Sequence, residues 1–287
     1  MRAEAQPLPL PLPLRAWQPL AAHAPVGVRM EVTARLARRL LQSDHAYVGA
    51  RGFVMRIDPA DRFQAAMLAG AYDPIVEKLV EHHAAPGSAA VDAGAHLGYF
   101  TLRLARAVGP QGSVHALECD PRLLPRLREH VDANGLHWVQ ISELAAADRS
   151  GDELTLHLPA QLGWASIREG IWPDEQTVTV RTATIDDVLD DAGVAPTAVS
   201  FVKLDVEGAE IEALRGLRRT LGGGRAAVLV EFIPWRMRAL GQDPDDLLAA
   251  LAEHGYAPWS AQRRGSRVQL VPGVAPSAGE DVLFLKR

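Results

Sequence analysis

The stretch Val91-Asp92-Ala93-Gly94-Ala95-His96-Leu97-Gly98-Tyr99-Phe100-Thr101 decides the fold of this chain. Its first residues are typical of a buried strand, its glycines predict a turn, and its last residues open a helix. Asp92 stands at the strand end, and a second acid, Glu118, follows the next predicted strand, residues 113–117. Two strand-end acids beside a glycine turn predict a pocket for a nucleoside that presents ribose hydroxyls.

Strands and helices alternate on both sides of this stretch, which predicts a parallel α/β sheet covered on both faces. We expect strands at 89–92, 114–118, 138–142, 153–158, 177–181, 199–204, 226–231, 256–260, 268–271 and 282–285. We expect helices at 98–108, 121–134, 185–192, 207–221 and 243–254.

Three regions are expected along the chain. Residues 1–28, rich in Pro and Leu, predict a flexible or polyproline arm. Residues 29–85 predict a small helical extension with helices at 30–42 and 74–83, the second capped by Asp73, and a short hairpin or strand at 47–57. Residues 86–287 form the large α/β domain. The helix at 30–42 is interpreted either as a lid over the pocket or as a homodimer contact.

Composition narrows the classes of protein. The net charge of −5 in 287 residues argues against a nucleic-acid partner, although the first 40 residues carry a local excess of +4, interpreted as a solvated face. No apolar run approaches the ~18 residues of a membrane span, so no membrane partner is expected. Cys119 is the only cysteine, which excludes an intrachain disulfide and fits a reducing, cytoplasmic location. Isolated histidines such as His130 are interpreted as solvent-exposed.

The spacing of the glycine turn favours one kind of cofactor. A dinucleotide turn needs Gly-x-Gly-x-x-Gly to hold a pyrophosphate, whereas this chain has Gly94-x-x-x-Gly98 with His96 between the glycines. The turn therefore suits a cofactor without phosphate, such as S-adenosylmethionine, whose amino-acid part binds the loop. Glu118 is then placed to accept from the ribose, and Asp148, after the third strand, is the candidate for adenine.

A second cluster of polar residues is Phe201-Val202-Lys203-Leu204-Asp205-Val206-Glu207-Gly208-Ala209-Glu210. Alternation along the strand puts Lys203 and Asp205 on one side. A lysine inside a buried strand must pair with an acid. Glu207 and Glu210 are expected on nearly one face of the following helix, where the helix dipole alone would also favour them.

Three segments together resemble the FkbM family of S-adenosylmethionine-dependent methyltransferases. They are Gly70-Ala71-Tyr72-Asp73-Pro74 with the Val91–Thr101 stretch, Lys203–Glu210 with Leu214-Arg215-Gly216, and Val228-Leu229-Val230-Glu231-Phe232. Family members usually carry Asn at position 96 and Pro at position 119. The resemblance implies a class I methyltransferase fold: a Rossmann-like, mostly parallel sheet with an antiparallel C-terminal strand. It also implies S-adenosylmethionine as cofactor and S-adenosylhomocysteine as product.

The implied reaction is O-methylation of a small-molecule hydroxyl, on a sugar or a specialised metabolite. Asp205 or Glu207 would accept the hydroxyl proton, and Lys203 would orient the acceptor group. The residues assigned to the cofactor are Asp92, Gly94, Ala95, His96, Gly98, Glu118, Cys119, Ala147, Asp148 and Asp205, and those assigned to the acceptor are Tyr72, Trp164 and Glu231. Mg²⁺ between Asp205 and Glu231 is not favoured, because the sequence offers no third ligand.

Other readings stay open at this point. Sequence does not fix the acceptor atom, so N-methylation of an amine is an alternative. A nicotinamide-dependent oxidoreductase could use Glu118 in the same way but lacks the dinucleotide turn. A non-catalytic binding module is disfavoured because Asp92, Glu118 and Asp205 are all present. A nucleic-acid base methyltransferase is disfavoured by the acidic balance and by the absence of an Asn/Asp-Pro-Pro-aromatic run.

Overall fold

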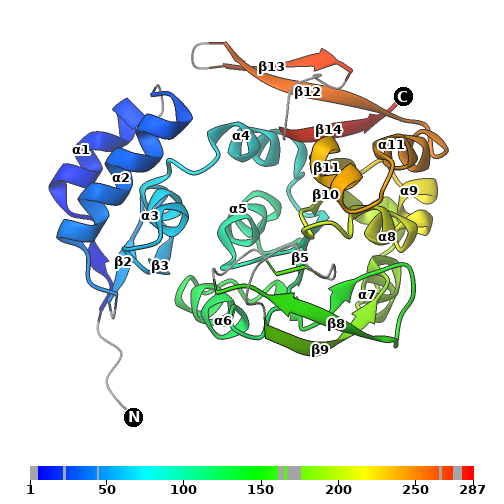
Figure 1. The fold of residues 1–287 in the computed structure, drawn as a ribbon, viewed down its shortest axis with the longest axis horizontal. Coiled ribbons are helices and arrows are strands. Elements are labelled where there is room, and N and C mark those ends of the chain that lie inside the picture. The colour runs from blue at the N-terminus through cyan, green and yellow to red at the C-terminus, as the bar shows by residue number, and fades with distance from the viewer. Residues whose placement is uncertain are drawn as a thin grey trace.

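An eight-stranded sheet organises the computed structural model, which describes residues 6–21, 24–43, 45–160, 165–166, 176–264, 267–273 and 280–287. The strand order is β13-β12-β14-β11-β10-β4-β5-β6 (Figure 1). The strands are β4 (Ala89–Ala93), β5 (Ser113–Leu117), β6 (Val139–Ser142), β10 (Val199–Leu204), β11 (Ala227–Phe232), β12 (Tyr256–Arg264), β13 (Arg267–Pro272) and β14 (Glu280–Lys286). The five strands from β6 to β11 are parallel, and β14 runs antiparallel to β11.

The strand order of the large sheet reverses at β4. The chain builds β4, β5 and β6 outward on one side, and then returns to lay β10 and β11 on the other side of β4. In open α/β sheets, ligands bind beyond the carboxyl ends of the strands at such a switch point. The fold therefore places the ends of β4 and β10, with Asp92 and Asp205, where a ligand is expected.

Helices cover both faces of the sheet and share two apolar cores. One core packs α4 (Pro74–His83), α5 (Tyr99–Val108) and α6 (Leu124–Ala133) against side chains such as Phe201 and Leu229. The other packs α7 (Ile185–Asp191), α8 (Glu210–Arg215), α9 (Arg218–Gly223), α10 (Pro234–Ala239) and α11 (Pro244–Ala252) against Val91, Val202 and Val228. A short 3₁₀ helix, η1 (Pro196–Ala198), precedes β10. Residues of each central strand alternate between the two cores, as a doubly covered sheet requires.

The N-terminal elements, called the N-terminal unit below, lie at one edge of the molecule (Figure 1). The unit contains β1 (Leu8–Pro9), α1 (Leu12–Ala21), α2 (Val26–Leu40), β2 (Ala46–Val48), β3 (Val54–Arg56) and α3 (Arg62–Ala69). A flexible or polyproline segment was expected here, but residues Leu12–Ala21 form the helix α1. Leu14 and Ala21 of this helix are buried, and the Trp17 indole donates to Thr33 Oγ1 at 2.9 Å. Burial of one face thus outweighs the helix-breaking prolines.

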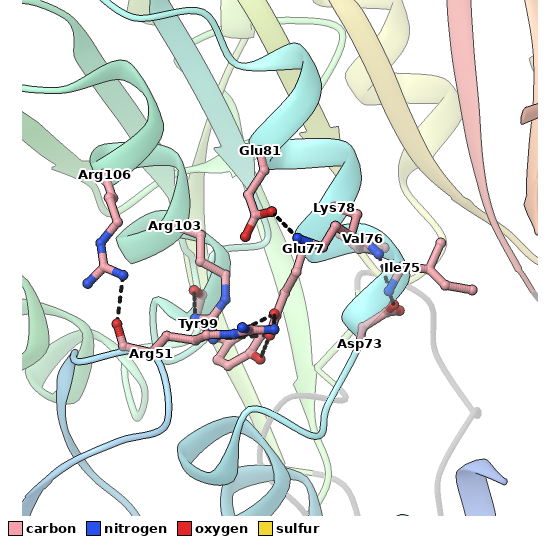
Figure 2. Close-up of polar contacts among 10 residues, drawn as sticks. All are labelled: Arg51, Asp73, Ile75, Val76, Glu77, Lys78, Glu81, Tyr99, Arg103 and Arg106. Carbon is pink, nitrogen blue, oxygen red and sulfur yellow. Dashed lines mark hydrogen bonds and ion pairs between the residues drawn. The ribbon is translucent and has the colours of Figure 1, made fainter. Parts of the chain in front are cut away.

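A buried network ties this unit to the large sheet (Figure 2). Glu77 of α4 is 2% exposed; it accepts from Arg51 of the β2–β3 loop at 2.6 Å, from Arg103 of α5 at 3.2 Å, and from the Tyr99 hydroxyl. One carboxylate therefore holds a loop and two helices together. Asp73 caps α4, as expected, by accepting from the backbone N–H groups of residues 75 and 76.

A second, smaller sheet lies beside the large one and has the order β7-β9-β8. It consists of β7 (Ala145–Ala146), β8 (Glu153–Leu158) and β9 (Gln176–Ala183). The expected single helix at 207–221 is wrong: it is divided into α8 and α9 at Gly216, where a Cβ atom would lie 2.0 Å from the Ala147 carbonyl oxygen. Among the described residues, no helix is long and apolar enough to cross a membrane.

Candidate active site

The loop between β4 and α5 is shaped by three residues with positive φ: Gly94 at 79°, His96 at 54° and Gly98 at 86°. A Cβ atom on Gly94 would lie 1.8 Å from the Asp205 carbonyl oxygen, so only glycine lets the loop pass this close to the end of β10. Histidine and asparagine are both enriched in the left-handed region. His96 therefore satisfies the backbone at a position where the family usually carries Asn.

Glu118 lies beside this loop with 7% of its surface exposed. Its Oε2 accepts from the His96 backbone N–H at 2.7 Å, and its Oε1 accepts from the Asp120 N–H at 2.8 Å. Burial raises the pKa of Glu118 to about 7, although the backbone donors oppose the rise. A carboxylate offers about four acceptor sites, so Glu118 can still accept a hydrogen bond from a ribose hydroxyl.

His130 of α6 holds the loop between β4 and α5, the expected cofactor loop, in place. Its Nδ1 lies 2.7 Å from the Leu97 carbonyl oxygen, and its Nε2 accepts from the Arg56 backbone N–H at 2.9 Å. The ring is 1% exposed, so the interpretation of His130 as solvent-exposed is wrong. Two backbone partners, one on the loop and one on β3, explain why a histidine is buried there.

The remaining residues assigned to the cofactor lie in different surroundings. Cys119 packs against the apolar cluster under β8 and β9, and burial raises the pKa of its thiol. Ala147 is buried and its carbonyl faces Gly216, whereas Asp148 is exposed beside the turn at 149–151. No contact among the described residues joins Asp148 to Glu118. Trp164, assigned to the acceptor, lies outside the described residues.

The strand register brings the polar residues of four strands onto one face of the sheet. Lys203 of β10 pairs with Asp92 of β4, and Glu231 of β11 pairs with Asp281 of β14. Asp205 lies two residues beyond Lys203, and so on the same side of the chain. Five ionisable side chains therefore converge at the sheet edge that the switch point opens.

Lys203 is the central cation of this group. It is 3% exposed, its Nζ donates to Asp205 Oδ2 at 2.8 Å, and it lies 5.2 Å from the centre of the Phe100 ring. Burial works to lower the pKa of Lys203, but the carboxylates of Asp205 and Asp92 outweigh burial and raise it. Lys203 is therefore charged, as its buried pairing with an acid requires.

Asp92 is anchored on one oxygen only. Its Oδ2 accepts from Thr101 Oγ1 at 2.6 Å, whereas its buried Oδ1 has no hydrogen-bond partner among the described residues. Burial raises the pKa of Asp92, and Lys203 opposes the rise. A buried acceptor without a partner is costly. Oδ1 is therefore available to a donor on a bound ligand or to a water molecule.

Three carboxylates gather beside Lys203. One oxygen each from Asp205, Glu207 and Glu231 lies within 4.8 Å of the others, and Arg236 of α10 bonds to Glu207 at 2.6 Å and to Glu231. The expected placement of Glu207 on the same helix face as Glu210 is wrong. Glu207 has φ of 51° and lies before α8, which begins at Glu210.

These carboxylates differ in their protonation. Burial raises the pKa of Glu207 to about 8 and raises that of Glu231 well above its usual range. Burial also acts to raise the pKa of Asp205, but Lys203 and a hydrogen bond with Glu231 lower it overall. Asp205 is thus the ionised member, and Glu231 carries the proton of their hydrogen bond.

Tyr72 lies against this group from the N-terminal side. Its ring packs edge-on to Tyr99 at 5.4 Å, and its backbone carbonyl accepts from the buried Arg29 of α2 at 3.0 Å. Burial raises the pKa of the Tyr72 hydroxyl, and the charge of Asp205 adds to the rise. Tyr72, which the sequence assigns to the acceptor, therefore lies near Asp205 and stays a neutral donor.

Sequence reasoning missed three members of the site: Asp73, Asp281 and Arg236. Asp281 and Asp73 share a hydrogen bond, and burial raises the pKa of both. Asp281 comes from β14, at the far end of the chain, and only the antiparallel pairing with Glu231 brings it here. A signal for Arg236 was present, because it follows the strand-end acid Glu231 by five residues.

A sequence model of the FkbM methyltransferase domain matches residues 92–258, more than half of the chain. The chain belongs to this family. The fold is that of the class I methyltransferases, as the resemblance implied, with β14 as its antiparallel C-terminal strand. The matched range includes both glycines of the cofactor loop, Glu118 and the Lys203–Glu207 segment, and it excludes the N-terminal unit and β14.

Solved structures of methyltransferases are similar to this chain at low identity. An FkbM methyltransferase from Methylobacillus flagellatus is 17% identical over 90% of this chain and 59% of its own, with a TM-score of 0.42. An O-methyltransferase from Thermotoga maritima is 13% identical over 74% and 65%, with a TM-score of 0.41. Aeropyrum pernix fibrillarin with bound S-adenosyl-L-methionine is 11% identical over 74% and 73%, also at 0.41. No curated protein sequence matches the chain.

Proposed function

We propose that this FkbM-family protein uses S-adenosylmethionine to methylate a hydroxyl group of a small molecule, such as a sugar or a specialised metabolite. The observation that supports this most is the ionised Asp205, held by Lys203 at 2.8 Å beside Glu207 at the switch point of the sheet. An acceptor hydroxyl needs a hydrogen-bond acceptor to orient it and a base to take its proton.

The residues at the ends of β4 and β5 fit the cofactor. Glu118 can still accept a hydrogen bond from a ribose hydroxyl, and Asp92 Oδ1 is a buried acceptor with no partner among the described residues. The cofactor supplies an activated methyl group. The task of the protein is then to align the acceptor with that group, which can be worth about 7–11 kcal/mol of the barrier.

We assign separate roles to the residues around Lys203. Lys203 is a positioning residue that fixes Asp205, and Asp205 accepts a hydrogen bond from the acceptor hydroxyl. Asp205, the ionised carboxylate, also takes that proton as the hydroxyl oxygen gains the methyl group, and Glu207, whose pKa is raised to about 8, is the alternative base above that pH. Asp148 remains the proposed adenine contact, although it is exposed. Arg236 neutralises the carboxylates, so we propose that the reaction needs no Mg²⁺.

N-methylation of an amine is the second candidate. The ionised Asp205 would also accept a hydrogen bond from an amine N–H group. An acceptor screen with paired hydroxyl and amino compounds, run with and without a chelator, separates the two candidates and tests the metal.

The first experiment is calorimetric titration with S-adenosylhomocysteine, with NADH in a parallel titration. We expect the first ligand alone to bind. Once an acceptor is found, Asp205→Asn should lower turnover by about 100-fold or more, as loss of a positioned acid–base group does, with little change in S-adenosylhomocysteine affinity. Wild-type turnover in that variant would remove Asp205 from the mechanism, and NADH binding alone would overturn the cofactor.

A further inference from the structure

The exposed apolar side chains of this protein are concentrated in the N-terminal unit. Among the described residues, the large apolar side chains left exposed are Leu8, Leu12, Leu20, Val26, Val28, Leu40 and Trp235. All but Trp235 lie in the first 40 residues. Single exposed apolar residues are normal on a protein surface, but a contiguous group marks an interaction site.

Helix α1 is apolar on both of its sides. Leu14 and Ala21 point inward and are buried, whereas Leu12, Ala16 and Leu20 recur every four residues on the outer side. Leu12 is 74% exposed and Leu20 is 63% exposed. A surface helix normally turns its apolar residues to the core, so the exposed Leu12 and Leu20 are a second apolar face that the described part of the chain leaves uncovered. In Figure 1, α1 and α2 lie at the edge of the molecule, with α3 on their inner side.

The same edge carries arginines. Arg15 of α1 and Arg35, Arg38 and Arg39 of α2 are exposed, and of these only Arg35 forms an ion pair within the described residues, with Glu31 at 2.7 Å. The first 40 residues have a net charge of +4, whereas residues 41–287 carry −9. The charge is therefore divided along the chain, with a basic N-terminal region and an acidic remainder.

We propose that the outer faces of α1 and α2 dock on an anionic lipid surface, with α1 lying in the plane of the headgroups. A helix that exposes leucines, with arginines nearby, has the features that bind an anionic lipid surface. A second copy is disfavoured because a two-fold contact would oppose two arginine-rich faces. A helix of ten residues is also small beside the ~800 Å² that each partner of a stable dimer buries.

This inference departs from the expectation of no membrane partner that composition alone suggested. It is independent of the proposed reaction, because none of the residues of this face belongs to the candidate active site. The charge average of the whole chain conceals this region, since the +4 of the first 40 residues is outweighed by the −9 of residues 41–287. The attraction should be screened by salt, as it is for exposed charges.

The test is flotation of the full-length protein with phosphatidylcholine vesicles, with and without phosphatidylglycerol. We expect binding only to the anionic vesicles. Arg15→Gln/Arg38→Gln/Arg39→Gln should lower the partition coefficient by about 100-fold, because each cation near such a surface contributes about fivefold. Leu12→Ser/Leu20→Ser should also abolish flotation. The matched control, Arg149→Gln/Arg181→Gln/Arg225→Gln, removes three exposed arginines elsewhere and should bind as the wild type does.

Absence of flotation by the wild-type protein would overturn the proposal, as would equal losses in the arginine variant and its control. A dimer in sedimentation that Leu12→Ser/Leu20→Ser converts to a monomer would also overturn it and assign the face to a second copy. All replaced side chains are exposed, so thermal unfolding should be unchanged in each variant.

Discussion

Glu118 shows how the surroundings of one carboxylate prepare it for a ligand. The strand β5 carries it to the sheet edge, and two backbone N–H groups fix its orientation before any ligand arrives. Its neighbours are neutral or already paired: burial lowers the pKa of His96 to about 4, and Asp120 is bonded to Arg122 at 2.7 Å. Glu118 is therefore the group in this pocket that titrates near pH 7.

Cofactor affinity should depend on pH through Glu118. Ribose hydroxyls donate to the ionised carboxylate, so binding lowers a pKa that burial has raised to about 7 in the free protein. Affinity for S-adenosylhomocysteine is then full above pH 7 and falls by up to about tenfold per pH unit below it. Calorimetry across this range checks the slope. Glu118→Gln should weaken binding and flatten the dependence, whereas Glu143→Gln, at an exposed carboxylate, should leave both unchanged.

At the residue scale, the sequence predicts those site members that follow strand ends. Asp92, Glu118, Lys203 and Asp205 were predicted because alternation and turn signals locate the ends of buried strands. Asp281 was not, because its place depends on an antiparallel pairing between strands about 50 residues apart. The conformation of Glu207 could not be predicted from the sequence either, since a positive φ in a non-glycine residue is set by tertiary contacts.

At the element scale, α10 supplies the positive charge of Arg236 to the carboxylate cluster. Arg236 bonds to Glu207 and Glu231, so one helical residue occupies the place that a divalent ion would take among three carboxylates. Burial lowers the pKa of Arg236, but the two glutamates outweigh burial and raise it, so the charge is permanent.

Removing this arginine should create a metal site. Arg236→Ala leaves three close carboxylates with one fewer cation, and we expect it to bind Mn²⁺ at least about tenfold more tightly than the wild type, because a unit charge near 4 Å is worth more than that factor. Calorimetry and the Mn²⁺-dependent rise in Tm measure the gain. Arg236→Lys retains the charge and should not show it. Equal Mn²⁺ affinity in the wild type would mean that the cluster accepts a metal despite Arg236.

The network around Glu77 should dominate the attachment of the N-terminal unit (Figure 2). Glu77→Ala leaves Arg103, 9% exposed, without its carboxylate, which typically costs about 3–5 kcal/mol. The control is Glu81→Ala on the same helix, whose ion pair with Lys78 is half exposed and contributes about 0–1 kcal/mol. Urea unfolding compares the two. Equal losses would show that the buried network adds nothing beyond a surface pair.

Elements with strong local signals were predicted well. The helix at 74–83 follows from Asp73-Pro74, and the structure has α4 over Pro74–His83 with the expected cap. The helix α1 was missed because its prolines oppose helix formation and its stabilising contacts come from α2 and α3. The break between α8 and α9 was missed because it arises from the approach of the Ala147 backbone, which no local pattern encodes.

At the scale of the whole molecule, the N-terminal unit is fastened to the methyltransferase domain at several points. Besides Glu77, Asn134 at the C-terminal end of α6 accepts from the Val54 N–H at 2.9 Å and donates to the Val54 carbonyl, and His130 joins β3 to the loop between β4 and α5. The division at residue 85 stays a prediction, since the two parts share one continuous apolar core from Leu10 to Leu283.

Deleting residues 1–24 tests how much α1 contributes to this assembly. The deletion removes the buried Leu14 and the Trp17–Thr33 contact, and we expect a loss of about 3 kcal/mol. In a chain of this size, such a loss lowers Tm by roughly 5 °C. S-adenosylhomocysteine affinity should be retained, because Glu118 and Asp92 are held at the ends of β5 and β4. The hydrogen bond from Arg29 of α2 to the Tyr72 carbonyl also remains. An unchanged Tm would support the expectation that this segment is a flexible arm. A loss of affinity without a change in Tm would show that α1 is part of the cofactor site.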